Sequence, residues 1–129
     1  MKGYSENIEE KTTSNNFFRQ VVFTGKNCQV VLMSLKPGEE IGMEVHPKVD
    51  QFFRFESGEG KVIIDGEEHK VSDGFAVVVP QGAMHNVINT SAKADLKLYT
   101  IYSPPNHPPG TVHKTKAEAD KAEEKEHKK

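Results

Sequence analysis

Short runs of apolar residues recur along most of the chain, and turn-forming residues separate them. The runs are rich in Val, Ile, Phe and Tyr, while Gly, Pro and Asp stand between them, as in TGKN, KPGE and SGEG. No helical pattern interrupts the runs, which disfavours a parallel α/β sheet. This pattern is typical of an antiparallel barrel or sandwich. We expect strands at residues 17–23, 28–36, 40–46, 50–56, 60–65, 67–71, 75–80, 85–90 and 96–102.

The chain changes character on both sides of this strand-rich region. Residues 1–16 are polar with few apolar anchors, so we interpret them as an N-terminal lead-in. After Tyr102 comes SPPNHPPG, with four prolines in eight residues. Proline removes the N–H that a sheet needs, so the sheet must stop there. The sequence therefore predicts a barrel at 17–104, followed by a Pro-rich loop and charged helical tail at 105–129.

The tail, TKAEADKAEEKEHKK, has the features of a helix. Thr115, followed three residues later by Glu118, forms a capping box. The apolar residues of the tail are alanines, so it has little surface to bury. We expect a short exposed helix; a partner-binding tail is the alternative, because a charge run is usually a solvated face.

Composition restricts the setting of the protein and its partners. A chain of 129 residues suits one domain, and a single cysteine allows no intramolecular disulfide. With no signal-like N-terminus and no apolar run of about 20 residues, we expect a cytoplasmic protein without a membrane partner. The net charge of −2 gives no field that attracts nucleic acid. The expected partner is therefore a small-molecule substrate.

Four polar residues stand where barrel strands should turn inward. Strand side chains alternate faces, so Glu44 and His46 point the same way, and Gln51 shares the face of the phenylalanines that follow it. His85 opens a later strand. Inward polar groups cost free energy unless they are paired. Two imidazoles, a carboxylate and an amide oxygen would make an N2O2 set for a divalent ion, with positions left open. The alternative is that they are unrelated surface or core residues.

Two motifs resemble those of a known family. Residues 74–89, GFAVVVPQGAMHNVIN, match the second cupin motif, G-x5-P-x-G-x2-H-x3-N, at every fixed position. Residues 38–58 follow the first motif, G-x5-H-x-H-x(3,4)-E-x6-G, in both glycines and in the second histidine, His46. Glu44 stands at the first histidine of that motif and Gln51 at its glutamate. The chain thus resembles the cupin superfamily, in particular small single-domain cupins, over residues 30–102.

The resemblance implies an all-β fold, an antiparallel double-stranded β-helix or jelly-roll barrel, here with a short exposed C-terminal helix. It implies a divalent metal ion (Mn, Fe, Zn or Ni) inside the barrel and assigns the ligand roles to Glu44, His46, Gln51 and His85. Small cupins commonly pair through N-terminal strands, so the resemblance also implies a homodimer formed by residues 17–23.

A divalent ion with this ligand set would act as a Lewis acid. We expect a non-redox isomerase, epimerase, cyclase or lyase acting on a small polyhydroxy or keto compound. Glu44, if it is not a ligand, and Tyr102 are the candidate acid–base residues. The alternatives are an Fe(II)-dependent dioxygenase, since two histidines and a carboxylate suit oxygen chemistry, and a non-catalytic small-molecule-binding cupin.

Basic residues add two further expectations. The chain has two arginines, Arg19 and Arg54, and Arg54 is out of phase with Gln51 and should point away from the metal. A phosphate clamp is therefore not expected, which disfavours a sugar-phosphate isomerase. His107 and His113 lie after the barrel; we expect an edge-covering loop or dimer contact there, with a lid over the barrel mouth as the alternative.

Overall fold

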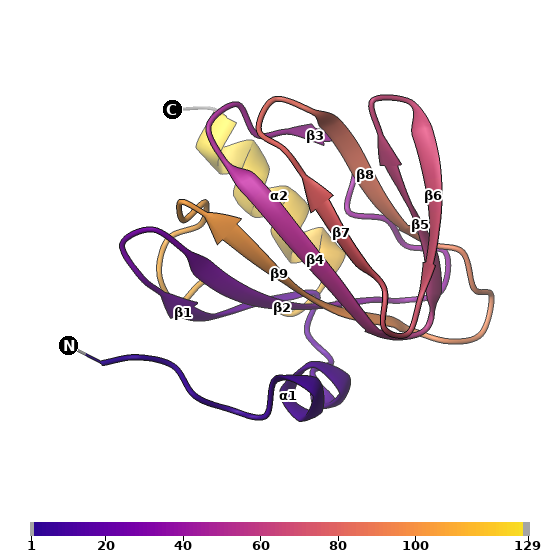
Figure 1. Ribbon diagram of the computed structural model, residues 1–129, viewed down its shortest axis with the longest axis horizontal. Helices are drawn as coiled ribbons and strands as arrows, with labels where there is room; N and C mark the ends of the chain where they lie inside the picture. The colour runs from indigo at the N-terminus through magenta and orange to yellow at the C-terminus, as the bar shows by residue number, and fades with distance from the viewer. Residues whose placement is uncertain (1, 128–129) are drawn as a thin grey trace.

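The computed structural model describes residues 2–127, with side chains described for residues 2–124. Within that range the chain forms short strands bracketed by two helices (Figure 1). The elements are α1 (Ile8–Ser14), β1 (Arg19–Thr24), β2 (Gln29–Leu35), β3 (Glu44–Val45), β4 (Asp50–Ser57), β5 (Glu59–Ile64), β6 (Glu67–Ser72), β7 (Ala76–Val79), β8 (Met84–Asn89), β9 (Leu96–Ser103), β10 (Val112–His113) and α2 (Lys116–His127).

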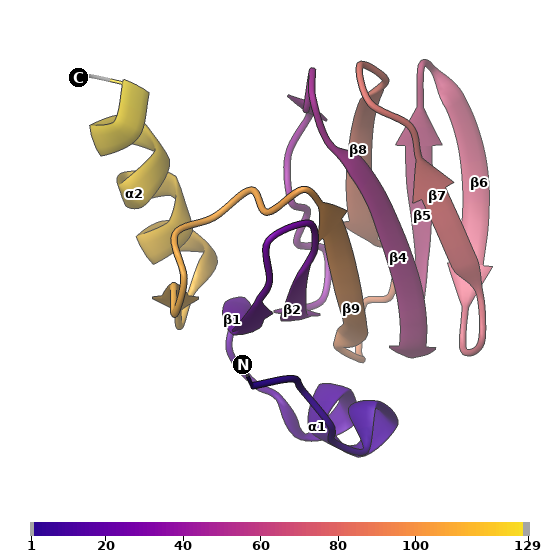
Figure 2. The same ribbon diagram turned by 60° about the vertical axis from the view of Figure 1, so that its left-hand side comes forward.

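The strands make two antiparallel sheets that face one another. One has the order β10-β1-β2-β9-β4-β7 and the other the order β3-β8-β5-β6. Strands distant in sequence are neighbours, as β4 is to β9, which is the crossed connectivity of a jelly roll (Figures 1 and 2). The inward faces enclose one apolar core that includes Phe53, Phe55, Met33 and Leu98. The predicted all-β fold is confirmed.

The predicted strand at 40–46 is the one that differs most from the structure. Only Glu44 and Val45 form a strand, β3, and Glu40 makes an isolated bridge to Ile88. Gly42 interrupts the run with a φ of 110°, a conformation that other residues rarely adopt. This short strand still places Glu44 opposite His85 of β8.

The hairpin between β5 and β6 helps to position the start of β8. Asp65 and Gly66 have φ values of 47° and 84°, as a two-residue hairpin turn requires. Asp65 exchanges two hydrogen bonds with the backbone of Met84: its Oδ1 accepts from the Met84 N–H at 2.8 Å, and its own N–H donates to Met84 O at 2.7 Å. The residue that follows Met84 is His85, so this turn fixes the strand that carries it.

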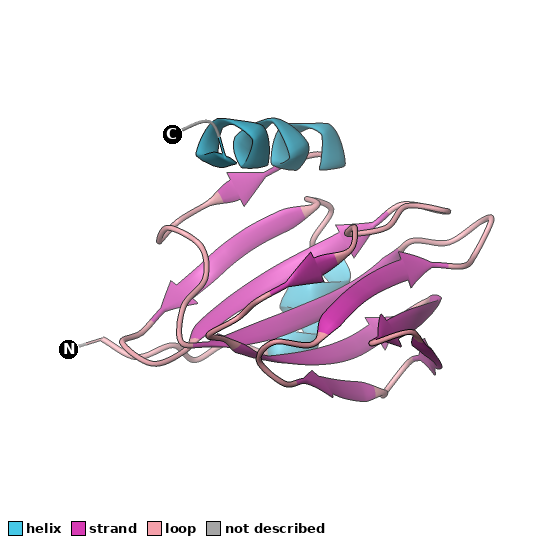
Figure 3. Ribbon diagram, turned by 90° about the horizontal axis from the view of Figure 1, so that it is seen from above, coloured by secondary structure: helices cyan, strands magenta, loops and turns pink. Residues whose placement is uncertain are grey.

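The lead-in contains a helix that the sequence does not predict. The side chain of Asn7 caps α1 by accepting from the N–H of Glu10 at 3.1 Å. Thr12 is the buried residue of α1, which lies against the outer face of the large sheet (Figures 1 and 3). A seven-residue polar helix is not stable alone, so its formation depends on this docking.

The C-terminal segment returns to the barrel before it forms a helix. β10 pairs with the start of β1, and α2 then stands beside the barrel (Figures 2 and 3). The predicted cap is confirmed, because the Glu118 N–H donates to Thr115 Oγ1 at 3.1 Å. Most described residues of α2 are exposed, as predicted, although Ala119 is buried. No helix within residues 2–127 is long and apolar enough to cross a membrane.

Candidate functional site

The four predicted ligands and Tyr102 come together at one end of the barrel. Gln51 lies opposite Tyr102 in the large sheet, and Glu44 lies opposite His85 in the small one. The ring of His46 is 5.3 Å from that of His85 and 5.8 Å from that of Tyr102, measured between centroids. We refer to this end as the barrel mouth.

Glu44 and His46 are in direct contact. Glu44 Oε2 lies 3.2 Å from His46 Nε2. Two ligand atoms about 2.1 Å from one metal ion lie about 3.0–3.4 Å apart, so this spacing suits two ligands of the same ion. Burial alone would raise the pKa of Glu44, but the neighbouring His46, with Arg19 and His85, outweighs burial and lowers the pKa. Glu44 is therefore ionised at neutral pH, as a ligand must be.

His85 is held with one ring nitrogen turned toward the backbone. Its Nδ1 lies 3.1 Å from the carbonyl oxygen of Ala83, a contact that requires Nδ1 to carry the proton. The neutral ring then has its lone pair on Nε2, which is the arrangement that metal-binding histidines usually have. Burial lowers the pKa of His85, and the nearby His46 adds to this shift, so the neutral form prevails at neutral pH.

Three buried polar atoms at the mouth have no hydrogen-bond partner among the described residues. They are Nε2 of His46, whose contact with Glu44 does not have hydrogen-bond geometry, Oε1 of Gln51, and Nε of Arg19. The Gln51 amide is fixed from its other side, since its Nε2 donates to Thr100 Oγ1 at 3.0 Å, and Thr100 in turn donates to Phe52 O at 2.9 Å. Unpaired buried groups are rare because they cost free energy, and two of these three belong to predicted ligands.

The donor atoms of the four predicted ligand side chains are of the kinds that bind a divalent metal ion. Two nitrogen and two oxygen ligands are of the kinds that Mn, Fe, Zn and Ni accept. Within the described side chains, however, no three His, Cys, Asp or Glu groups are arranged around a single point. A metal at this position would therefore need the amide of Gln51, and its binding would draw the ligands closer together.

The mouth opens into a cavity of about 400 Å³ between the barrel and α2. A volume of this size suits a small molecule. The lining comes from the barrel, from the Pro-rich segment with β10, and from α2. The residues are Arg19, Met43, Glu44, Val45, His46, Asn106, His107, His113, Ala119, Ala122 and Glu123.

His107 reaches this cavity because Gln29 holds the Pro-rich segment in place. The fully buried Gln29 donates from Nε2 to the carbonyl oxygen of His107 at 2.8 Å. Its Oε1 accepts from the N–H groups of His107 and Asn106 at 3.0 and 3.1 Å. The segment thus lines the cavity, as in the lid that the sequence offers as an alternative, and through β10 it also covers the edge of the large sheet at β1, as expected.

His107 and Tyr102 form a pair above the predicted ligands. Nε2 of His107 lies 3.3 Å from the Tyr102 hydroxyl, and their rings meet edge to face. Burial lowers the pKa of His107 to about 3, and the positive charge of Arg19 adds to this shift. Burial also raises the pKa of Tyr102 well above its usual value. At neutral pH the pair therefore consists of a neutral imidazole and a protonated phenol.

Sequence reasoning missed two residues of the mouth, Arg19 and Gln29. Both lie at inward positions of their strands, opposite Met33 and Tyr102 respectively. Strand parity could have found them, because each is the polar member of an otherwise apolar inward row. Arg54 points away, as predicted, and pairs with Glu56.

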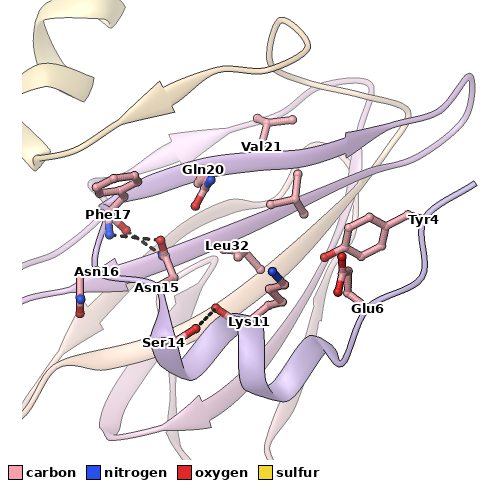
Figure 4. A pocket seen from close by; sticks show the side chains of 11 residues that line it. Tyr4, Glu6, Lys11, Ser14, Asn15, Asn16, Phe17, Gln20, Val21 and Leu32 are labelled. Carbon is pink, nitrogen blue, oxygen red and sulfur yellow. Dashed lines mark hydrogen bonds between the residues drawn. The ribbon is translucent and has the colours of Figure 1, made fainter.

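A larger cavity, of about 600 Å³, lies on the outside of the barrel (Figure 4). It is an open groove between the N-terminal segment, α1 and strands β1 and β2, with Tyr4 and Glu6 on one side and Gln20 on the other. None of the predicted ligands lines it, so we place the functional site at the barrel mouth.

Comparisons with known proteins support the same assignment of fold. The Cupin domain family matches residues 31–102, more than half of the chain. The uncharacterized protein YrkC of Bacillus subtilis (strain 168) is 53% identical, over 95% of this chain and 69% of the relative. The uncharacterized protein L612 of Acanthamoeba polyphaga mimivirus is 43% identical, over 84% of this chain and 70% of the relative.

The crystal structure of BH2720 from Bacillus halodurans superposes on most of the chain. Its TM-score is 0.90 at 44% identity, and the match covers 93% of this chain and 95% of that one. The family match and these identities together go beyond a likeness of fold. The chain belongs to the cupin family, whose members often hold a metal ion.

Proposed function

We propose that this cupin is a non-redox enzyme that uses a divalent metal ion at the barrel mouth to act on a small polyhydroxy or keto compound. The isomerases, epimerases, cyclases and lyases are the reaction classes that this chemistry serves. The observation that carries the proposal is a pair of buried atoms without a hydrogen bond among the described residues, His46 Nε2, which lies 3.2 Å from Glu44 Oε2, and Gln51 Oε1. They lie beside the His85 imidazole, whose backbone contact leaves its Nε2 free. A bound cation is the simplest partner for all three atoms.

In this proposal Glu44, His46, Gln51 and His85 hold the ion. The ion supplies Lewis-acid chemistry by polarising a carbonyl or hydroxyl oxygen of the substrate. Because Glu44 is then a ligand, Tyr102 is the one that remains of the two predicted acid–base residues.

Tyr102 and His107 are the residues that could form hydrogen bonds with the substrate beside the ion. Burial holds the Tyr102 phenol protonated and the His107 imidazole neutral, so the phenol can donate a hydrogen bond to a substrate oxygen and the imidazole can take part as a neutral group. His107 Nε2 lies 3.3 Å from the Tyr102 hydroxyl, so each group helps to orient the other. Gln29 fixes the backbone of His107, and α2 with the Pro-rich segment encloses the cavity above the ligands.

Metal analysis tests the proposal. Protein purified without added metal, and protein loaded with Mn, Fe, Zn or Ni, should hold one ion per chain, and both His46→Ala and His85→Ala should lose it. His69→Ala is the matched control, because His69 lies on β6 outside the mouth, next to Glu67, and its loss should leave the metal content unchanged. Absence of metal, with no change of thermal stability on metal addition, would contradict the proposal.

Substrate screening separates the remaining functions. Turnover of sugar acids or diketones without oxygen uptake supports the isomerase or lyase classes. Bound iron with oxygen consumption would instead indicate a dioxygenase, and tight binding without turnover would indicate a non-catalytic binding protein.

We also propose that the protein is a homodimer, as the family resemblance implies. Within the predicted dimer strand at residues 17–23, Arg19 and Gln20 are paired with β10. The outermost strand of the large sheet is therefore β10, on which Val112 is exposed. Sedimentation equilibrium of the full chain tests this; a monomer at all concentrations would contradict it.

A further inference from the structure

Arg19 is a buried cation that has no ion pair with any side chain of residues 2–124. Its exposed fraction is 7%, and it forms no ion pair with any described carboxylate. Its Nε makes no hydrogen bond, and its Nη1 lies 3.2 Å from Nδ1 of His113. Glu44 interacts with Arg19 electrostatically but makes its contact with His46. A buried charge without a directly paired counter-ion is costly to maintain, so an anion is the partner that suits this position.

The surrounding structure holds the Arg19 guanidinium firmly. The residue opens β1 and is paired on both sides, with Met33 of β2 and with His113 of β10. Since Met33 is fully buried, Arg19 shares the inward face of the sheet. Its Cζ also lies 5.3 Å from the ring centroid of Phe18. A group held in this way is prepared to bind a ligand with little further ordering.

Arg19 faces the same cavity as the predicted metal ligands. It lines the mouth cavity together with Glu44, His46 and His107, and among the lining residues that the structure describes it is the single Lys or Arg. The carboxylates of the lining are Glu44, which is in contact with His46, and Glu123 on α2. If Glu44 serves the metal, the charge of Arg19 is left for a ligand.

We propose that Arg19 binds the carboxylate of a small organic acid in the mouth cavity, so that the substrate is a hydroxy or keto acid, such as a sugar acid. As a statement about the substrate this rests on the proposed function, whereas the binding itself does not require the metal. The planar fork of a guanidinium matches a carboxylate through two parallel hydrogen bonds. One arginine beside two glutamates suits a monoanionic carboxylate better than a phosphate dianion, which needs more positive charge.

Nuclear magnetic resonance on the wild-type protein gives a direct test. The chain has two arginines, so two Nε–H signals can be followed and assigned with Arg19→Met and Arg54→Met. Titration of the metal-free protein with D-gluconate should shift the Arg19 signal and not the Arg54 signal. D-glucitol, which has a hydroxymethyl group in place of the carboxylate, should shift neither. Pyruvate and its amide form a second pair with the same expectation.

Calorimetric titration of variants measures the contribution of the side chain. Arg19→Met should weaken gluconate binding by about tenfold or more, the usual effect of losing a charged hydrogen bond. Arg54→Met should bind as the wild type does, because Arg54 pairs with Glu56 outside the mouth. Without ligand, Arg19→Met should unfold at a temperature no lower than the wild type, since it removes an uncompensated charge. Arg19→Lys keeps the charge and should bind gluconate with intermediate affinity.

Several outcomes would overturn the inference: an Arg19 signal that neither acid shifts, undiminished gluconate binding by Arg19→Met, or phosphate binding that exceeds carboxylate binding. If Arg19→Met does not fold, the wild-type titration and Arg19→Lys decide. Each titration is repeated with zinc. If gluconate shifts the Arg19 signal in a chain that binds no metal, this inference holds and the proposed function fails. If the chain binds metal but gluconate leaves the Arg19 signal unshifted, the proposed function holds and this inference fails.

Discussion

The two ends of the barrel are built from the same strands but differ in chemistry. Toward the closed end the inward positions are mostly apolar, and toward the mouth they are polar. The exception at the closed end, Asn89, has its amide hydrogen-bonded to Leu35 O and Ala94 O. On β4 the inward row runs from Phe55 and Phe53 to Gln51, and on β2 it runs from Leu35 and Met33 to Gln29. Every one of these side chains is buried, so exposure to water does not explain the change.

This difference separates the end of the barrel that stabilises the fold from the end that is suited to bind a ligand. At the closed end buried side chains pack against other apolar groups and stabilise the fold. At the mouth His46, Gln51 and Arg19 each bury an atom with no hydrogen-bond partner among the described residues. A protein keeps such groups where a ligand completes them, and the remaining fold compensates for their cost.

Substitutions at two positions of the same strand should show the largest difference in stability between the two ends. Phe53→Ala should lower the free energy of unfolding by about 3–5 kcal/mol, because it leaves a cavity in the closed end. Gln51→Leu, two residues away on the same face, should change it by less than about 1 kcal/mol in metal-free protein, since it removes an unpaired oxygen. Urea denaturation measures both, and a loss from Gln51→Leu as large as that from Phe53→Ala would show that the mouth is structural.

The gain in stability on metal binding should depend on the mouth and not on the closed end. Zinc at a hundred times its dissociation constant should stabilise the wild type by about 2.7 kcal/mol. His46→Ala should lose this increment. Phe55→Leu, weakened at the closed end, should keep it in full, because none of the proposed ligands changes and Phe55 lies further from the mouth than Phe53, whose ring meets that of His85. Thermal denaturation with and without zinc gives these values, and an equal loss of the increment in both variants would contradict the assignment.

The pH dependence of stability should come from the mouth. His107 has a pKa of 6.5 in the unfolded chain and of about 3 in the folded one, because burial opposes its charge. Between these values the unfolded chain binds the extra proton, so stability falls as the pH decreases from about 6.5 toward 3. His107→Asn should remove on the order of 2 kcal/mol of this loss, measured by urea denaturation at a series of pH values.

The matched control for that measurement is His69→Asn, which changes a histidine outside the mouth. Its profile should follow that of the wild type. A His107→Asn profile that is equally steep would show that His107 does not carry the effect.

The smallest expected change in stability is in helix α2, which forms one wall of the mouth cavity. Thr115→Ala removes the side-chain acceptor for the Glu118 N–H and should cost about 1 kcal/mol of helix stability. Amide exchange should become faster in α2 and remain unchanged in β4 and β9. Thr111→Ala serves as a control outside the helix cap. Faster exchange throughout the barrel would mean that α2 is part of the global folding unit.

Much of the barrel could be predicted because its signals are local. The alternation of side chains and the turn residues locate β4, β5, β8 and β9 within one or two residues of where they lie. Helix α1 could not be predicted, because its polar sequence gains stability only by docking Thr12 on the sheet. Parity alone also left open which face of β9 is inward; the structure buries Tyr102 and turns Tyr99 outward, toward Phe52.

The candidate site divides in the same way. Parity and the two motifs brought Glu44, His46, Gln51 and His85 to one face, and the structure gathers them at the mouth, where their ligand role stays a prediction. The cavity above these residues could not be predicted from the sequence, because it depends on contacts between segments that are distant along the chain. Gln29 and His107 are 78 positions apart, and Arg19 and His113 are 94 apart.

The sequence by itself therefore determined the cupin barrel and the residues that turn into it, because strand period, turn chemistry and motif spacing are properties of neighbouring residues. The tertiary structure alone decided that Arg19, without an ion pair among the described side chains, and a neutral His107 face the mouth. No local pattern encodes that placement: the return of the Pro-rich segment across Gln29 and the pairing of β10 with β1 create the cavity, and only that closure removes both side chains from water.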